Sequence, residues 1–266
     1  MKTINRELRI ADRISADLTY ITEPSDAQKI IIGAHGFLGC KDSIFWPFAA
    51  RHCAEHGIPF LKFNFSLNGI GPDKYNITEL DDFRQNTIAQ ELNDIQTVVD
   101  YCVTELRIPH TGIYLFGHSL GAFVSLIYIL SGGPAQAVIA FAPPLHILSK
   151  LKEEMVREDP DGIVLYSEGL EAELKIGTAF LKDYETNAEK YDILKNISKL
   201  SMPLKLIHFK DDRTVSYEES KKIYNAAPKD FVTLDIFNGG SHSLIQDDGK
   251  LDLRNIERLL EVVCKI

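Results

Sequence analysis

One short stretch of this sequence, Gly117-His-Ser-Leu-Gly121, places a serine between two glycines. The apolar run 111–116 before it predicts a buried strand, and the apolar run 122–130 after it predicts a helix. A serine on such a strand-to-helix turn has a strained backbone and an exposed hydroxyl, and the next N–H points toward the helix N-terminus. Ser119 is therefore a candidate nucleophile, and the N–H of Leu120 is a candidate donor to an oxyanion.

A serine nucleophile needs a neighbouring base, and a histidine base needs a carboxylate to orient it. In strand-turn-helix sites the acid and then the histidine follow the serine along the chain. Of the eight histidines, only His242 follows the last predicted strand, in the glycine-rich turn 238–243, so it is the candidate base. Asp211 and Asp212 both follow the penultimate strand; the position of Asp212 three residues before Val215 favours it as the acid. Asp211 is expected to be solvated or to cap a turn, although an adjacent carboxylate can act as a substitute.

A second oxyanion donor is expected in the loop after an earlier strand, which here is His35-Gly-Phe-Leu38. Gly36 allows the backbone to turn its amides toward the pocket, and the N–H of Phe37 is the candidate donor. His146 opens a later segment and is a weaker candidate for the pocket. Of the other histidines, His208 lies within a predicted strand and is expected in the core, and structural roles are expected for His35 and His118. Solvent-exposed positions at helix ends or in loops are expected for His52, His56 and His110.

The elements that must position these residues alternate between strands and helices. Residues 7–21 predict edge strands or a hairpin, and the further predicted strands are 29–34, 58–65, 111–116, 135–141, 203–209 and 230–237. The predicted helices are 43–56, 83–107, 122–130, 216–227 and 251–263. This alternation predicts an α/β fold, a mostly parallel sheet with helices on both faces and a ligand site at the carboxyl ends of the strands.

The pattern changes between residues 145 and 201, where charged residues become more frequent. A small hairpin is predicted at 162–169 and a helix at 176–191. We interpret 145–201 as an inserted lid within a single domain of residues 1–266. Candidate apolar walls of the pocket are the aromatic residues Phe37, Phe180 and Tyr184.

The composition limits the classes of partner and cofactor. The net charge of −9 and the absence of a basic run argue against a nucleic-acid partner. The four cysteines lack the spacing of a zinc motif or a disulfide framework, so neither a metal nor a cofactor is expected. The charged N-terminus does not resemble a signal peptide, and no apolar run approaches the ~18 residues of a membrane span. A cytoplasmic protein without a membrane partner is predicted.

Four motifs stand together in the order and context of an α/β-hydrolase: His35-Gly-Phe37, Gly117–Gly121, Asp212-Arg-Thr-Val215 and Gly240-Ser-His242. The sequence resembles this superfamily over nearly its whole length. Within it the sequence is most similar to small intracellular esterases of the cinnamoyl and feruloyl kind. Those share a His-Gly-Phe loop, an insertion after the sixth core strand and an Asp-Asp followed by Val-Ser, here Asp211–Ser216. The resemblance implies a nucleophile, a base, an acid and two oxyanion donors at Ser119, His242, Asp212, Phe37 and Leu120.

The predicted function is the cleavage of small-molecule carboxylic esters through an acyl-enzyme intermediate. A peptidase or a thioesterase of the same fold remains open, and so does a ligand-binding protein without turnover. The sequence departs from the esterases it resembles in the loop 64–71 and at Leu120, where those enzymes often have glutamine. Both departures fall at the predicted pocket and concern specificity. The sequence is compatible with a homodimer and does not determine the oligomeric state.

Overall fold

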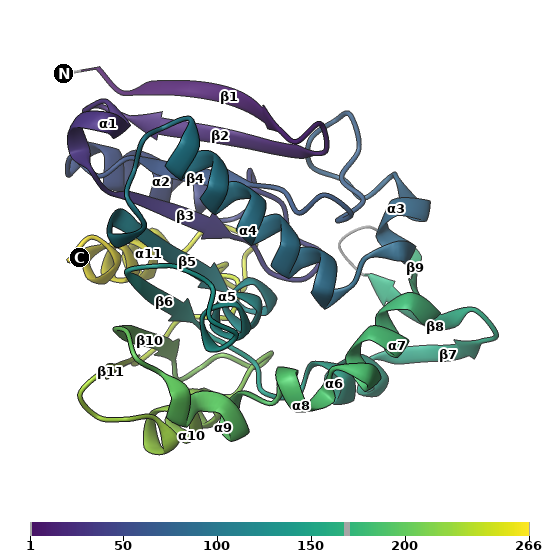
Figure 1. Ribbon diagram of the computed structural model, residues 1–266. Coiled ribbons are helices and arrows are strands. Elements are labelled where there is room, and N and C mark those ends of the chain that lie inside the picture. Colours follow the sequence, from purple (N-terminus) through teal and green to yellow (C-terminus); the bar gives the residue numbers. More distant parts are fainter. Residues whose placement is uncertain (1, 168–170, 266) are drawn as a thin grey trace.

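The computed structural model describes residues 2–167 and 171–265, and its central feature is an eight-stranded sheet (Figure 1). Two antiparallel pairings at one edge are followed by five parallel ones among the described residues. The order across the sheet is β1 (Ile4–Ile10), β2 (Ile14–Tyr20), β4 (Phe60–Phe63), β3 (Ile30–Ala34), β5 (Ile113–His118), β6 (Ala137–Phe141), β10 (Leu204–Phe209) and β11 (Val232–Phe237). The predicted mostly parallel sheet and the predicted N-terminal hairpin are thus confirmed.

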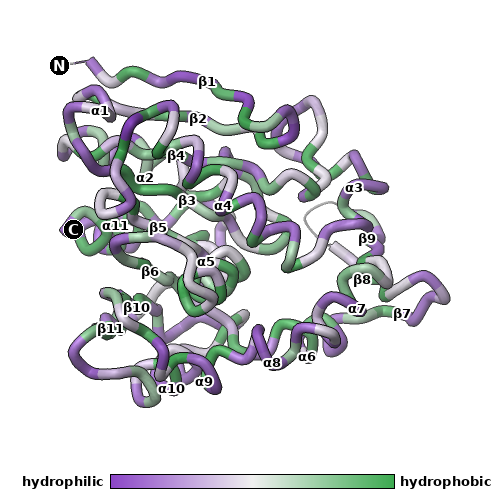
Figure 2. The backbone as a smooth tube through the Cα atoms, in the orientation of Figure 1, coloured by the Kyte–Doolittle hydropathy of each residue, from purple (hydrophilic) through white to green (hydrophobic). Residues whose placement is uncertain are grey.

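Helices cover both faces of this sheet because its central strands are apolar on both sides. In β3, Ile31 faces the core beneath α2 (Trp46–Glu55) and α11 (Leu253–Val263). Ile30 and Ile32 face the opposite core, which is covered by three helices: α4 (Ile88–Thr104), α5 (Leu120–Leu130) and α10 (Tyr217–Ala226). Figure 2 shows the apolar character of β3 and α5 along the chain. Such continuous apolar runs are typical of strands buried on both faces.

The helix predicted over 83–107 is two helices in the structure, α3 (Leu80–Gln85) and α4. Asn86 and Thr87 between them have extended backbones. The Thr87 side chain accepts a hydrogen bond from the N–H of Gln90 at 3.0 Å, which caps α4. The Thr-x-x-Gln spacing is that of a capping box, but the N–H of Thr87 donates to Oδ1 of Asn86 at 3.0 Å and not to Gln90, so only the Thr87 half of the box forms. This local cap competes successfully with a continuous helix.

The chain between β6 and β10 forms a small antiparallel sheet with short helices around it (Figure 1). The strands are β7 (Met155–Asp159), β8 (Gly162–Ser167) and β9 (Ala172–Gly177). The hairpin predicted at 162–169 is wrong, because 162–167 is one strand that pairs with both neighbours; residues 168–170 lie outside the described part. The helix predicted at 176–191 begins at Thr178 because Ile176 and Gly177 pair with β8. The helices here are α6 (Ile147–Glu153), α7 (Thr178–Thr186), α8 (Ala188–Tyr191) and α9 (Ile193–Asn196), with a 3-10 turn, η2 (Ile197–Lys199).

Two short elements complete the described chain: α1 (Pro24–Ala27) before β3, and a 3-10 turn, η1 (His110–Gly112), before β5. Across the described residues, each helix is too short or too polar to cross a bilayer.

Candidate active site

Ser119 lies on the sharp turn between β5 and α5, with φ 53° and ψ −120°. A left-handed backbone costs conformational free energy in a serine. The N–H of Ser119 donates a hydrogen bond to the carbonyl of Phe141 at 2.9 Å, which helps to hold this conformation. Side chains at the flanking glycines would collide with backbone, at Gly117 with Gly121 and at Gly121 with Ala34. The two glycines of the predicted motif therefore allow the close packing that keeps the serine in place.

Asp212 and His242 come together beyond the ends of β10 and β11. The Nδ1–H of His242 donates to Oδ2 of Asp212 at 2.7 Å. The other oxygen, Oδ1, accepts from the N–H groups of Thr214 and Val215 at 2.9 and 2.8 Å. With Nδ1 engaged, Nε2 of His242 is the nitrogen available to another partner. Asp211 is exposed, so the structure selects Asp212 as the partner of the histidine.

Sequence reasoning placed His208 in the core, which is correct, but missed its contact with Asp212. Nε2 of His208 lies 2.9 Å from the carbonyl of Val215 and 3.3 Å from Oδ2 of Asp212, while Nδ1 lies 2.8 Å from the hydroxyl of Ser220. Since both neighbours of Nε2 are acceptors, Nε2 carries the proton. Burial raises the pKa of Asp212, but hydrogen bonds from His208 and His242 outweigh this and hold that pKa below its usual range.

His118 has the structural position expected of it. Its Nε2 lies 3.0 Å from the carbonyl of His242 and donates to it, and its ring stacks on Phe141. Complete burial holds the pKa of His118 well below its ordinary value, so the ring stays neutral. His118 thus supports the loop that carries His242.

His35 anchors the loop after β3. Its Nδ1–H donates to the carbonyl of Gly36 at 2.9 Å, and its Nε2 accepts from the backbone N–H of Phe65 at 3.4 Å and the side-chain amide of Asn68 at 3.2 Å. Burial lowers the pKa of His35 to about 4, which keeps this tautomer uncharged at neutral pH. A Cβ on Gly36 would lie only 3.0 Å from the Cβ of Ser119, so the loop passes directly against the serine.

A cavity of about 260 Å³ opens onto these groups, and Ser119, His242, Phe37 and Leu120 all line it. The chain between β6 and β10 contributes further lining residues: Ile147, Lys150, Leu151, Glu154 and Phe180. Two other residues expected near the pocket, His146 and Tyr184, are not among those that line this cavity. His146 is exposed to solvent. The ring of Tyr184 stacks on that of Phe180, with 6.3 Å between the ring centroids.

Comparison with known proteins identifies the architecture. No family model and no curated protein matches the sequence. The structure matches Est1E from Butyrivibrio proteoclasticus with ferulic acid bound, at TM-score 0.69 and 20% identity over 97% of each chain. It also matches an esterase domain from Rhodothermus marinus, at TM-score 0.69 and 17% identity over 99% of this chain and 97% of that one. The Pyrococcus furiosus esterase Pf2001 matches at TM-score 0.63 and 18% identity over 98% and 91%. The chain has the α/β-hydrolase fold.

The α/β-hydrolase fold accounts for the separation of the site residues along the chain. Parallel strands bring their carboxyl ends to one edge of the sheet, and loops after different strands meet there. Ser119 follows β5, Asp212 follows β10 and His242 follows β11. The order serine, acid, histidine is the order that this fold uses for a triad.

In the described part of the chain, one group of side chains has the spacing of metal ligands, namely His52, His56 and Cys264. This group lies outside the lining of the cavity.

Proposed function

We propose that the protein is a serine hydrolase that cleaves carboxylic esters, with Ser119, His242 and Asp212 as its triad. The observation that supports this most strongly is the 2.7 Å bond between His242 and Asp212 beside a serine with a left-handed backbone. The residues proposed for an acyl-transfer site all border one cavity: the nucleophile Ser119, the imidazole of His242, and Phe37 and Leu120, whose N–H groups are the candidate oxyanion donors.

In the proposed reaction the hydroxyl of Ser119 attacks the ester carbonyl while Nε2 of His242 removes its proton. The carboxylate of Asp212 stabilises the imidazolium through Nδ1–H. The N–H groups of Phe37 and Leu120 donate to the oxyanion of the tetrahedral intermediate. The imidazolium returns the proton to the departing alcohol, leaving an acyl-serine. A water molecule, deprotonated by His242, then releases the acid and restores Ser119.

We further propose that residues 145–201 act as the lid of this cavity and contribute to acyl specificity. The lid side of the lining is largely apolar, with Ile147, Leu151 and Phe180, which suits an aliphatic or aromatic acyl group. Lys150 and Glu154 add charge to the lining of the same cavity. Est1E was crystallised with ferulic acid, so phenolic acyl esters belong among the first substrates to test.

The test is the hydrolysis of p-nitrophenyl esters from acetate to decanoate, together with methyl ferulate. Replacement of the nucleophile, Ser119→Ala, should lower kcat/KM by about a thousandfold or more. The matched control is Ser131→Ala, an exposed serine at the other end of α5, which should retain full activity. The chain length with the highest kcat/KM then measures the depth of the acyl pocket.

Two other outcomes would redirect the proposal. If no ester is cleaved but a fluorophosphonate labels Ser119, the triad is active toward another acyl group, and peptides and thioesters are tested next. If neither turnover nor labelling occurs in the folded protein, the serine-hydrolase proposal is wrong and a ligand-binding role takes its place.

A further inference from the structure

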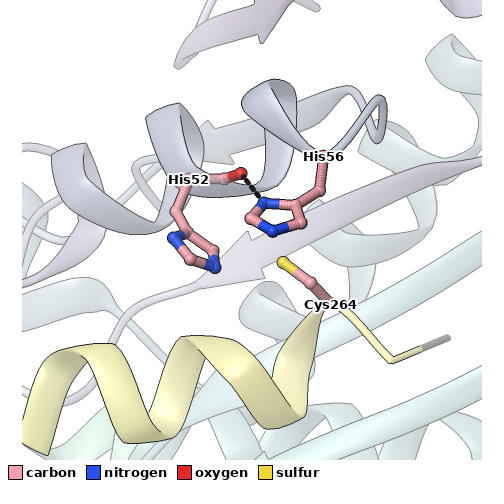
Figure 3. A group of neighbouring side chains, drawn as sticks. All are labelled: His52, His56 and Cys264. Carbon is pink, nitrogen blue, oxygen red and sulfur yellow. Dashed lines mark hydrogen bonds between the residues drawn. The ribbon is translucent and has the colours of Figure 1, made fainter.

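The C-terminal ends of α2 and α11 lie together on one face of the sheet and bring two imidazoles and a thiol to one point. His52 and His56 are four residues apart on α2 and therefore share one side of that helix. Cys264 is the C-cap residue of α11. Ligand atoms of the three side chains all lie within 4.8 Å of one another. Figure 3 shows the two rings and the thiol pointing toward one another.

Each of the two rings has a nitrogen available to a metal ion. Nδ1–H of His56 donates to the carbonyl of His52 at 2.8 Å, so Nε2 of His56 keeps its lone pair. Nε2 of His52 is buried and has no hydrogen-bond partner among the described residues. A buried polar atom without a partner is unfavourable, and a metal ion would satisfy it. The ring centroids are 4.4 Å apart, so both imidazoles can reach one ion.

The sulfur of Cys264 has a second sulfur as its nearest polar neighbour. Sγ of Cys53 lies 3.1 Å away. Metals bind the thiolate form of cysteine, and a Cys264 thiolate can accept the S–H of Cys53 across this distance. Two carboxylates of α11, Glu257 and Glu261, also act on His52 and add negative charge near the cluster.

We propose that His52, His56 and Cys264 bind Zn²⁺ as three protein ligands, with water in the fourth position on the exposed side of His56. Two nitrogens and a thiolate suit zinc, with bonds of about 2.0–2.1 Å to nitrogen and 2.3 Å to sulfur. Two nitrogens and one sulfur in a tetrahedral site are then roughly 3.3–3.6 Å apart, so ligand atoms that now lie up to 4.8 Å apart must approach one another by up to about 1.5 Å. Both His56 and Cys264 cap their helices, where side chains can make that shift. Cys53 remains outside the coordination shell and supports the thiolate through its hydrogen bond.

The site would join two elements that flank the catalytic loops. The loop with Phe37 leads into α2, and the loop with His242 leads into α11. A zinc ion bound only to the folded chain stabilises it by mass action. With zinc at about a hundredfold over its Kd, Tm should rise by about 5 °C or more. This effect is independent of the proposed esterase activity.

The test uses the tag-free full chain, reduced with a phosphine, and Co²⁺ as a spectroscopic probe for zinc. One equivalent of Co²⁺ should produce intense tetrahedral d–d bands and a thiolate charge-transfer band, and Zn²⁺ should remove both. Cys264→Ser should abolish the charge-transfer band, and His56→Gln should weaken binding at least tenfold. The matched control is His110→Gln, an exposed histidine of η1, which should leave the titration unchanged.

Two further readouts decide the details. Cys53→Ser should keep the band of a single thiolate; loss of half its intensity would show that Cys53 is a ligand and overturn the three-ligand assignment. In the unsubstituted chain, Zn²⁺ should protect Cys264 from alkylation, as measured by mass spectrometry, so a failure of a variant to fold does not affect the test. Absence of a cobalt band and of protection in the reduced protein would overturn the zinc site.

Discussion

Glu91 is a buried carboxyl group whose protonation should make the stability of this protein fall as pH rises. It lies in the first turn of α4, is 3% exposed and accepts one hydrogen bond, from the side-chain amide of Asn86 at 2.8 Å. Its other oxygen, Oε2, is buried without a partner in the described structure. Burial is the main cause that raises the pKa of Glu91 from 4.5 to about 8; the charge of Asp94 raises it further, and Asn86 opposes the change.

The direction of the pH effect follows from which state binds the proton more strongly. Between the unfolded pKa of 4.5 and the folded pKa of about 8, the unfolded chain ionises at Glu91 while the folded chain stays protonated. The free energy of unfolding therefore decreases across this range as pH rises. At about 1.4 kcal/mol for each pKa unit, the loss attributable to Glu91 approaches about 4 kcal/mol by pH 8.

Urea unfolding of the unsubstituted protein and of Glu91→Gln at about pH 5 and about pH 8 measures this contribution. The glutamine retains an oxygen for Asn86 and cannot ionise. The variant should therefore have about the unsubstituted stability at the lower pH and exceed it by several kcal/mol at the higher pH. Glu105→Gln, at an exposed position at the end of the same helix, is the control. A stability difference for Glu91→Gln that is the same at both pH values would refute this reasoning.

Two further predictions concern the loops that carry the proposed catalytic residues. Asp212→Asn should lower kcat about a thousandfold or more by releasing His242 from its orientation, while Asp211→Asn should stay within about twofold of the unsubstituted protein; equal losses in ester hydrolysis would contradict the choice of Asp212. Gly36→Ala should lower kcat about tenfold with little change in Tm, because its Cβ would lie 3.0 Å from the Cβ of Ser119 and 3.3 Å from the carbonyl of His118. Unchanged kinetics in that variant would show that the loop can shift without consequence.

The sequence by itself determined the α/β order of elements and the position of the serine turn. Both depend on short-range patterns: apolar runs of strand or helix length, and glycines on either side of Ser119. The errors in the bounds predicted from the sequence also came from short-range patterns. The N-cap at Thr87 divides a helix that apolar spacing alone predicts as continuous. Strand pairing in the chain between β6 and β10 extends β9 to Gly177, which spacing assigned to a helix.

Only the tertiary structure decided which side chains meet. In the sequence, His208 looks like any histidine within a strand. In the structure, the turn after β10 brings the carboxylate of Asp212 next to the imidazole ring of His208. Cys53 and Cys264 are 211 positions apart and show no metal-binding spacing, but the packing of α2 against α11 places their sulfurs 3.1 Å apart. Local preferences act over a few residues, whereas such contacts depend on how helices pack across a whole sheet. That packing is a property of the complete hydrophobic core.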